Sequence, residues 1–184
     1  MRKIQMRAST IKLVAIITAA INVIFSHKPD IFNSSQFKIS IIPLLLFSFV
    51  LHSISTYANF VLHEQGHFEI SKRLAPTSAR KTGGAAITID TEDIKYGWLG
   101  LILISVAGPI VNILIAAVFF FLALLYGHGF FITDFLTIIS VSLALGYINL
   151  IPSSVSDGGK ILLSIIALFR RFYHRYISSP SYNR

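Results

Sequence analysis

The segment His63-Glu64-Gln65-Gly66-His67 carries the residue types of a catalytic metal site. On a helix, residues four apart share a face, so both imidazoles can bind one metal ion. Glu64 then lies beside the ion, where its carboxylate can take a proton from a water molecule. The alternative is a pair of interfacial histidines with an incidental acid. We prefer the metal site, because an ionisable side chain in or beside so apolar a stretch is costly and usually functional.

Zinc suits this segment, and catalytic zinc takes three protein ligands while keeping one position for water. The chain contains no cysteine, so the third ligand must be His, Asp or Glu. Glu69 follows His67 by only two residues and points away from the metal face of the helix. The third ligand must therefore come from a distant part of the chain, and its identity depends on the topology.

The composition is that of a membrane protein. Of the 184 residues, 54% are hydrophobic and only 13% are charged, and the mean hydropathy is +0.70. A soluble domain carries about 25% charged residues, so an ordinary cytosolic enzyme is excluded. The absence of cysteine excludes a disulfide framework, a thiolate zinc site and a cysteine nucleophile. The net charge of +8 beside long apolar runs indicates the cytoplasmic flanks of membrane spans and not a nucleic-acid binder.

Long stretches without Asp, Glu, Lys or Arg lie at 39–63, 96–133 and 135–156. Each is long enough for the roughly 20 apolar residues that cross a bilayer. A weaker segment precedes them, with Lys12 near one of its ends. The sequence therefore predicts four transmembrane helices, at about 8–26, 40–63, 98–126 and 134–152.

The first of these segments also fits a signal peptide, because it follows basic residues and contains the small pair Ala19-Ala20. We favour a retained helix, since the apolar run continues to Phe25. The expected fold is an all-α polytopic membrane protein, in which residues 1–184 form a single membrane-embedded domain. Alternating residues in the segment 81–97, between the second and third spans, predict a short membrane-associated β-like piece.

Positive charges are distributed unevenly between the two sides of this topology. With the N-terminus inside, only Lys28 and Lys38 of the sixteen Lys and Arg residues fall on the outer side. This bias predicts that both termini are cytoplasmic. The expected location is the cell (plasma) membrane. The segment 160–177 has too few apolar residues to cross the bilayer, and its end mixes aromatic with basic side chains. It is expected to lie at the interface, with an ordinary helix end as the alternative.

This topology selects Asp157 as the third ligand. Asp157 follows the inner end of the fourth span, on the side where His63 and His67 close the second span. A turn residue before Gly158-Gly159 is the competing interpretation. The other His and acidic side chains are less suitable, because they lie on the outer side or in a polar loop: His128, Asp134, Asp90, Glu92 and Asp93.

Four further polar residues in the spans need partners. Asn112 is either a catalytic amide or an interhelical hydrogen-bonding residue, whereas the position of Asn149 near the third ligand favours a place in the site. Asn59 and His52 lie on the same helix face as His63. They can line a water path, support the metal ligands, or be satisfied by a neighbouring helix.

Taken together, the motifs resemble those of the site-2 protease family of intramembrane zinc metalloproteases. They match in spacing and order over about residues 40–168: His63-Glu64-x-x-His67, Ala107-Gly-Pro-x-x-Asn112, Asn149-x-x-Pro152 and Asp157-Gly158-Gly159. The resemblance implies Zn²⁺ bound by His63, His67 and Asp157. It also implies that Glu64 is the catalytic acid/base and that Asn149 orients the site. Ser154 stands where many members carry proline and Lys160 where arginine is common, and neither departure touches the chemistry.

The resemblance further implies hydrolysis of a peptide bond within or near the transmembrane segment of a membrane-anchored protein, such as an anti-sigma factor. A zinc-activated water molecule would attack near the cytoplasmic side, with Glu64 as general base. A helical substrate must unwind first, and the strand-like Ala85–Asp90 can accept it by edge pairing. Proline at Ile87 or Ile89 should then impair cleavage.

Three alternatives use the same motif. One is a membrane zinc protease whose third metal ligand is a Glu from a later helix. The chain has no such residue, because Glu92 is its last Glu and precedes the third span. A metal transporter needs polar residues through the outer leaflet, and few are present there apart from His52 and scattered hydroxyl groups. A non-catalytic membrane scaffold is disfavoured by the presence of Glu64. The substrate and the oligomeric state stay open.

Overall fold

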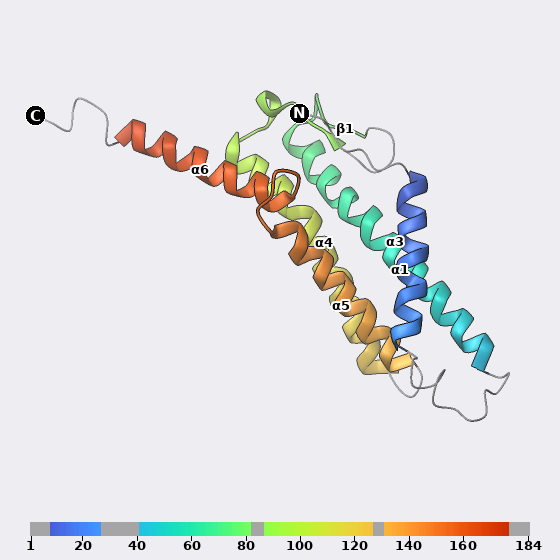
Figure 1. Cartoon of the computed structure of the whole chain (residues 1–184). Coiled ribbons are helices and arrows are strands. Elements are labelled where there is room, and N and C mark those ends of the chain that lie inside the picture. The colour runs from blue at the N-terminus through green and yellow to red at the C-terminus, as the bar shows by residue number, and fades with distance from the viewer. Residues whose placement is uncertain (1–7, 27–40, 82–86, 127–130, 177–184) are drawn as a thin grey trace, which may run out of the picture.

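The computed structural model of the chain describes residues 8–26, 41–81, 87–126 and 131–176, which form a helical bundle (Figure 1). Its longer helices are α1 (Ala8–Ser26), α3 (Ile41–Leu74), α4 (Trp98–Tyr126), α5 (Phe131–Leu150) and α6 (Asp157–Tyr176). Helix α4 packs against both α3 and α5, and α1 packs against α3. The end of α3 and the starts of α4 and α6 lie at the same end of the bundle.

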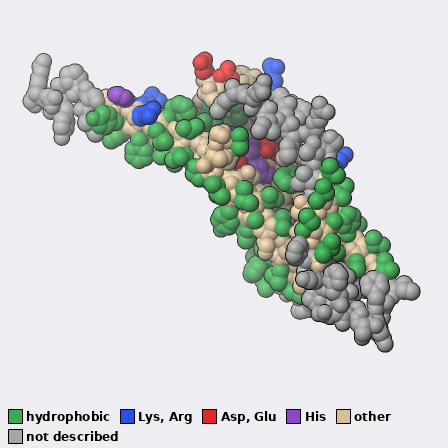
Figure 2. Space-filling model, viewed as in Figure 1, with side chains coloured by type: hydrophobic (Ala, Val, Ile, Leu, Met, Phe, Trp, Pro, Cys, Tyr) green, Lys and Arg blue, Asp and Glu red, His purple; other side chains and the backbone are tan. Residues whose placement is uncertain are grey.

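Within the described residues, three helices are long and apolar enough to cross a membrane: α3, α4 and α5. The expectation of an all-α, multi-pass membrane protein is therefore confirmed. Helix α1 contains a shorter apolar stretch, Ala15–Ile24, so the fourth span and its retention stay predictions. Hydrophobic side chains cover much of the outside of the bundle in Figure 2, as expected for a surface that faces lipid.

Helix α3 is longer than the span predicted at 40–63, since it continues to Leu74. Charged residues end the apolar stretch but not the helix, because Glu, Gln, Lys and Arg are good helix formers. Lys72 and Arg73 also lie in the last turn, where positive charge is favourable. At 1.5 Å per residue, this 34-residue helix is about 50 Å long. The segment from His63 to His67 therefore lies inside a helix that fixes the direction of its side chains.

A small β-hairpin follows α3. Strand β1 (Arg80–Lys81) pairs antiparallel with β2 (Ile87–Thr88), with Arg80 opposite Thr88. Strand β2 lies in the stretch predicted to be strand-like, whereas Ala85 of that stretch lies outside the described residues. The 3-10 helix η1 (Thr91–Asp93) then leads towards α4. A small apolar cluster holds this connection against the ends of α3 and α4: Ala75, Ile94 and Ile104.

The interior of the bundle contains many polar side chains beside its apolar ones. Buried polar residues of α3 recur at spacings of three and four residues, so they form one continuous helix face. They are Ser48, His52, Ser55, Thr56, Asn59, His63, His67 and Ser71. Across the α3–α5 interface, the Asn59 amide donates to Ser142 Oγ at 2.9 Å. Hydrogen bonds of this kind between helices help to hold membrane bundles together.

A second buried contact joins α3 to α5 near the other end of the bundle. His52 Nε2 lies 3.0 Å from Asp134 Oδ1, and Ser48 Oγ donates to Asp134 Oδ2 at 2.7 Å. The neighbouring helix α5 therefore provides a partner for Nε2 of His52, while its buried Nδ1 has no hydrogen-bond partner. Helix α5 begins at Phe131 and not at 134, because a buried, paired Asp134 can lie inside the helix.

Removal of one member of this pair should destabilise the protein. We expect Asp134→Leu to lower the free energy of unfolding by about 3 kcal/mol, because His52 is left buried opposite an apolar side chain. The double variant His52→Leu/Asp134→Leu should recover part of this loss, since it leaves neither ionisable group. Unfolding with increasing SDS in mixed micelles measures both changes. Strictly additive effects of the two substitutions would contradict a direct interaction.

Candidate metal centre

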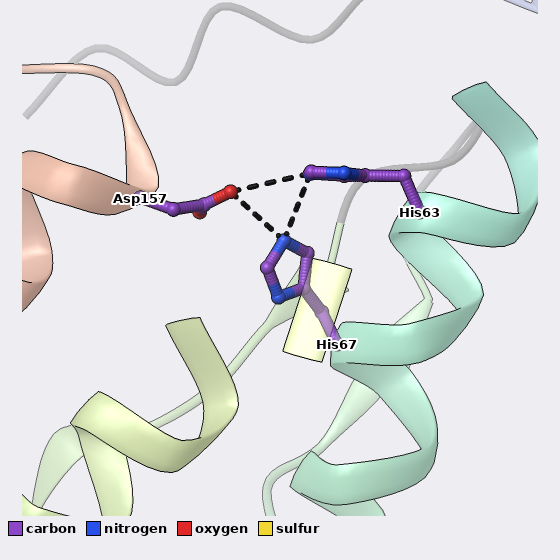
Figure 3. Close-up of side chains that lie close together, drawn as sticks. All are labelled: His63, His67 and Asp157. Atoms are coloured by element: carbon purple, nitrogen blue, oxygen red, sulfur yellow. Dashed lines mark hydrogen bonds and ion pairs between the residues drawn. The ribbon is translucent and has the colours of Figure 1, made fainter. Parts of the chain in front are cut away.

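Three side chains from two distant parts of the chain meet at one end of the bundle (Figure 3). His63 and His67 project from α3, and Asp157 projects from the first turn of α6. The Nε2 atoms of the two histidines lie 3.2 Å apart. Asp157 Oδ2 lies 3.2 Å from His63 Nε2 and 3.1 Å from His67 Nε2. Each of the three residues is only 6% exposed. The structure thus brings together the residues predicted as ligands.

In its neutral form, His67 has an electron pair that faces this centre. Nδ1 lies 2.6 Å from the carbonyl oxygen of Ile104, which can only accept, so Nδ1 carries the proton. In the neutral imidazole, Nε2 is then an acceptor. It faces a carboxylate oxygen of Asp157, which is also an acceptor. A cation between these atoms would remove their repulsion.

Asn112 of α4 is placed to orient His63 in the same way. Its Nδ2 atom lies 3.2 Å from His63 Nδ1, while its buried Oδ1 has no hydrogen-bond partner. Rotation of the amide by about 180° puts Oδ1 where it accepts the Nδ1–H of His63, which satisfies both groups. His63 Nε2 then presents its electron pair to His67 and Asp157. Helix α4 would thus fix both imidazoles through their Nδ1 atoms, as outer partners do at metal sites.

Gly108 leaves space in front of the two imidazoles. A Cβ atom at this position would lie 2.3 Å from His67 Nε2 and 2.6 Å from His63 Nε2. Gly66 plays the corresponding part on α3, because its Cβ would lie 2.9 Å from the carbonyl oxygen of Ala107. The two glycines therefore permit the close approach of α3 and α4 that a small residue in a membrane helix allows.

Asp157 is positioned by tight packing at the start of α6. A Cβ at Gly158 would lie 2.0 Å from the carbonyl oxygen of Leu150, and one at Gly159 would lie 1.8 Å from that of Ser153. Only glycine lets α6 begin this close to the end of α5. The Gly-Gly pair after Asp157 is thus a packing requirement that brings the carboxylate to the histidines.

The charge of Asp157 is balanced on both sides. Lys160 donates to Oδ1 at 2.8 Å, which leaves Oδ2 for the imidazoles. Burial alone would raise the pKa of Asp157, and the Lys160 ammonium opposes this effect because it favours the charged carboxylate. The side chain is therefore an ionised carboxylate, the form that binds a metal ion.

Glu64 and Asn149 line the same cavity as these three residues. The cavity has a volume of about 190 Å³ and is largely polar. Asn149 Nδ2 lies 3.4 Å from His63 Nε2, so its amide is within reach of a group held at the centre. Glu64 is half-buried and follows His63 directly on α3. Both residues predicted as catalytic thus share one space with the predicted ligands.

The donor set fits zinc. Two imidazole nitrogens and one carboxylate oxygen are typical of a catalytic zinc site. Bonds of about 2.0–2.1 Å at a tetrahedral ion place neighbouring ligand atoms about 3.3 Å apart, close to the 3.1–3.2 Å separations found here. Among the described residues, no fourth His, Asp or Glu belongs to the group. A three-ligand group of this kind leaves a coordination position open.

Other residues considered as ligands lie apart from the centre. Glu69 accepts a hydrogen bond from Gln65 on the exposed side of α3, and Asp93 accepts one from Ser78. His128 lies outside the described residues. The sequence analysis gave Lys160 no part in the chemistry, whereas the structure pairs it with the predicted ligand Asp157, one helical turn earlier. Sequence reasoning also missed the Ile104 carbonyl, for which side-chain types give no signal.

Substitution of Asn112 should weaken metal binding without removing it. We expect Asn112→Leu to lower zinc affinity by about 10–100-fold, because His63 loses the acceptor for its Nδ1–H. Asn112→Asp keeps an acceptor and should retain most of the affinity. Competition with a chromophoric chelator measures both variants in detergent. Wild-type affinity in Asn112→Leu would contradict the orienting role.

Comparison of the chain with protein families, with curated proteins and with solved structures found no match.

Proposed function

We propose that this protein is an intramembrane zinc metalloprotease that resembles the site-2 protease family. One observation carries the proposal: His63, His67 and Asp157 converge on one buried centre, in a cavity that Glu64 also lines. Two imidazoles, a carboxylate and an adjacent acid are the set that metal-assisted peptide hydrolysis requires. Such a set inside a membrane bundle supports the cleavage of a membrane-anchored protein.

Different residues of the chain have different roles in the proposed reaction. When bound by His63, His67 and Asp157, zinc would supply a water molecule of lowered pKa and would polarise the scissile carbonyl. Glu64 would accept the proton of that water on its carboxylate and deliver it to the leaving amine. The Asn149 amide would donate a hydrogen bond to the carbonyl oxygen of the substrate as negative charge develops there.

The proposed substrate is a transmembrane segment cleaved near the cytoplasmic side of the cell membrane. Support comes from the uneven charge distribution, which favours a cytoplasmic location for the end of α3 and the start of α6. The hairpin lies at the same end of the bundle as the end of α3, so it would face the same side of the membrane. Its strand β2 is the proposed edge on which an unwound substrate would pair.

Removal of the metal should abolish this activity reversibly. The protein, reconstituted in liposomes with single-span membrane proteins, is expected to produce a shortened product. A membrane-permeant zinc chelator should stop the cleavage and added zinc should restore it, while the non-chelating isomer of the same compound should have no effect. Cleavage that continues at full rate in metal-free protein would contradict the proposal.

A metal transporter is the second candidate, and one observation favours it. Buried polar contacts between α3 and α5 extend from the metal centre to the opposite half of the bundle, through the Asn59–Ser142 and His52–Asp134 contacts. A transporter would keep zinc flux into liposomes in the Glu64→Gln variant, because Glu64 is not a ligand. The protease would show no flux and would lose cleavage.

A further inference from the structure

Helix α6 leads away from the bundle from the point where it supplies Asp157 (Figure 1). Its first two turns are held in place, since Asp157, Gly158, Gly159 and Ser164 are buried against the neighbouring helices. After Ser164, most side chains are exposed. The helix has 20 residues and is therefore about 30 Å long, of which the second half extends beyond the bundle.

The exposed part of α6 has one apolar face. Leu162, Ile165, Phe169 and Tyr173 follow one another at spacings of three and four residues, so they lie on the same side of the helix. Phe169 is 71% exposed and Tyr173 is 53% exposed. Large aromatic side chains with this exposure are costly in water. The apolar run from Ile161 to Phe169 is too short to cross a bilayer, so this face must be covered in another way.

The other face of α6 is basic. Lys160, Arg170 and Arg171 are exposed, and the helix contains no acidic residue after Asp157. In Figure 2, the part of α6 that projects from the bundle has hydrophobic side chains along its lower edge and basic side chains on its upper edge. A helix at a membrane surface needs this arrangement, with the apolar face in the bilayer and the charges at headgroup level.

We infer that the second half of α6 docks on an anionic phospholipid surface, in the leaflet that contains the metal centre. Positive charge favours anionic headgroups over neutral ones, because each Lys or Arg near such a surface adds to the attraction. Because Asp157 is the first residue of the docked helix, this attachment sets the metal centre close to the headgroup level. The inference holds whether or not the centre is catalytic.

A probe placed on each face of α6 tests this inference in the full-length protein. The chain has no cysteine, so Phe169→Cys and Arg171→Cys each introduce a single site for an environment-sensitive fluorophore. The labelled proteins are placed in nanodiscs of phosphatidylcholine with or without phosphatidylglycerol. At position 169 we expect a blue-shifted emission that spin-labelled lipid quenches, and more strongly with phosphatidylglycerol. At position 171 we expect the emission of an aqueous environment in both lipids.

Removal of charge from the basic face should weaken docking. In the Phe169→Cys background, Arg170→Gln/Arg171→Gln should lower the ratio of docked to undocked helix by about 30-fold in anionic nanodiscs. Equal emission at 169 and 171 would overturn the inference. So would docking that is the same in neutral and anionic lipid. Shielding at 169 without quenching by spin-labelled lipid would also overturn it, since this outcome indicates contact with protein.

Discussion

Glu64→Gln is expected to lower the rate of cleavage by about 10²–10⁴-fold while the protein still binds zinc. The glutamine amide keeps the size of the side chain but cannot accept the proton of the attacking water. His63, His67 and Asp157 are unchanged, so the zinc content should stay at that of the wild type. Production of the shortened substrate and the zinc content of the same preparation measure the two quantities separately.

Glu69→Gln is the matched control for this substitution. Glu69 lies on the same helix, five residues further on, but it is exposed and outside the cavity. Its replacement should leave cleavage unchanged. If Glu64→Gln cleaved at the wild-type rate, Glu64 would not be the acid/base. If it lost zinc together with activity, the acid would belong to the metal ligands and the proposed division of roles would be wrong.

Gly108→Ala is expected to lower zinc affinity by more than 100-fold. The added methyl group would lie 2.3 Å and 2.6 Å from the Nε2 atoms that face the centre, so at least one imidazole must move. Displacement of a ligand should cost more than the 10–100-fold that loss of an outer hydrogen bond typically costs. The zinc content of the purified variant and competition with a chelator measure this effect.

Gly146→Ala tests whether any added methyl group in the bundle has the same consequence. At this position on α5 the nearest heavy atom to a new Cβ is the Pro109 carbonyl oxygen at 3.4 Å, which is close to an ordinary contact. We expect Gly146→Ala to bind zinc nearly as well as the wild type. Helical content by circular dichroism should be retained in both variants. Normal zinc binding by a folded Gly108→Ala variant would contradict the placement of the centre.

The helices could be predicted from the sequence where charge marks their ends. The predicted span 98–126 coincides with α4, because charged or turn residues flank a stretch without charge. The same rule misplaced the end of α3, where Glu64 and Lys72 continue the helix outside the apolar stretch. It also misplaced the start of α5, because Asp134 is buried and paired. A charged residue marks the limit of an apolar surface, but the helix itself can continue beyond that residue.

The metal centre could be predicted only in part. The spacing of His63 and His67 determines that they share a helix face, and topology brought Asp157 to the same end of the bundle. The partners of their Nδ1 atoms depend on how α4 is rotated about its axis, which no local pattern gives. For this reason Asn112 could not be distinguished beforehand from an interhelical hydrogen-bonding residue.

The most direct test of the proposed centre is the X-ray absorption spectrum of the purified protein at the zinc edge. We predict one zinc ion per chain with nitrogen and oxygen ligands, and with the scattering pattern of two imidazoles. In Asp157→Asn, the zinc content should fall and the remaining zinc should lose its carboxylate oxygen, whereas Asp93→Asn should match the wild type. A chain that binds no stoichiometric zinc, or a spectrum that neither His63→Ala nor Asp157→Asn alters, would contradict the account.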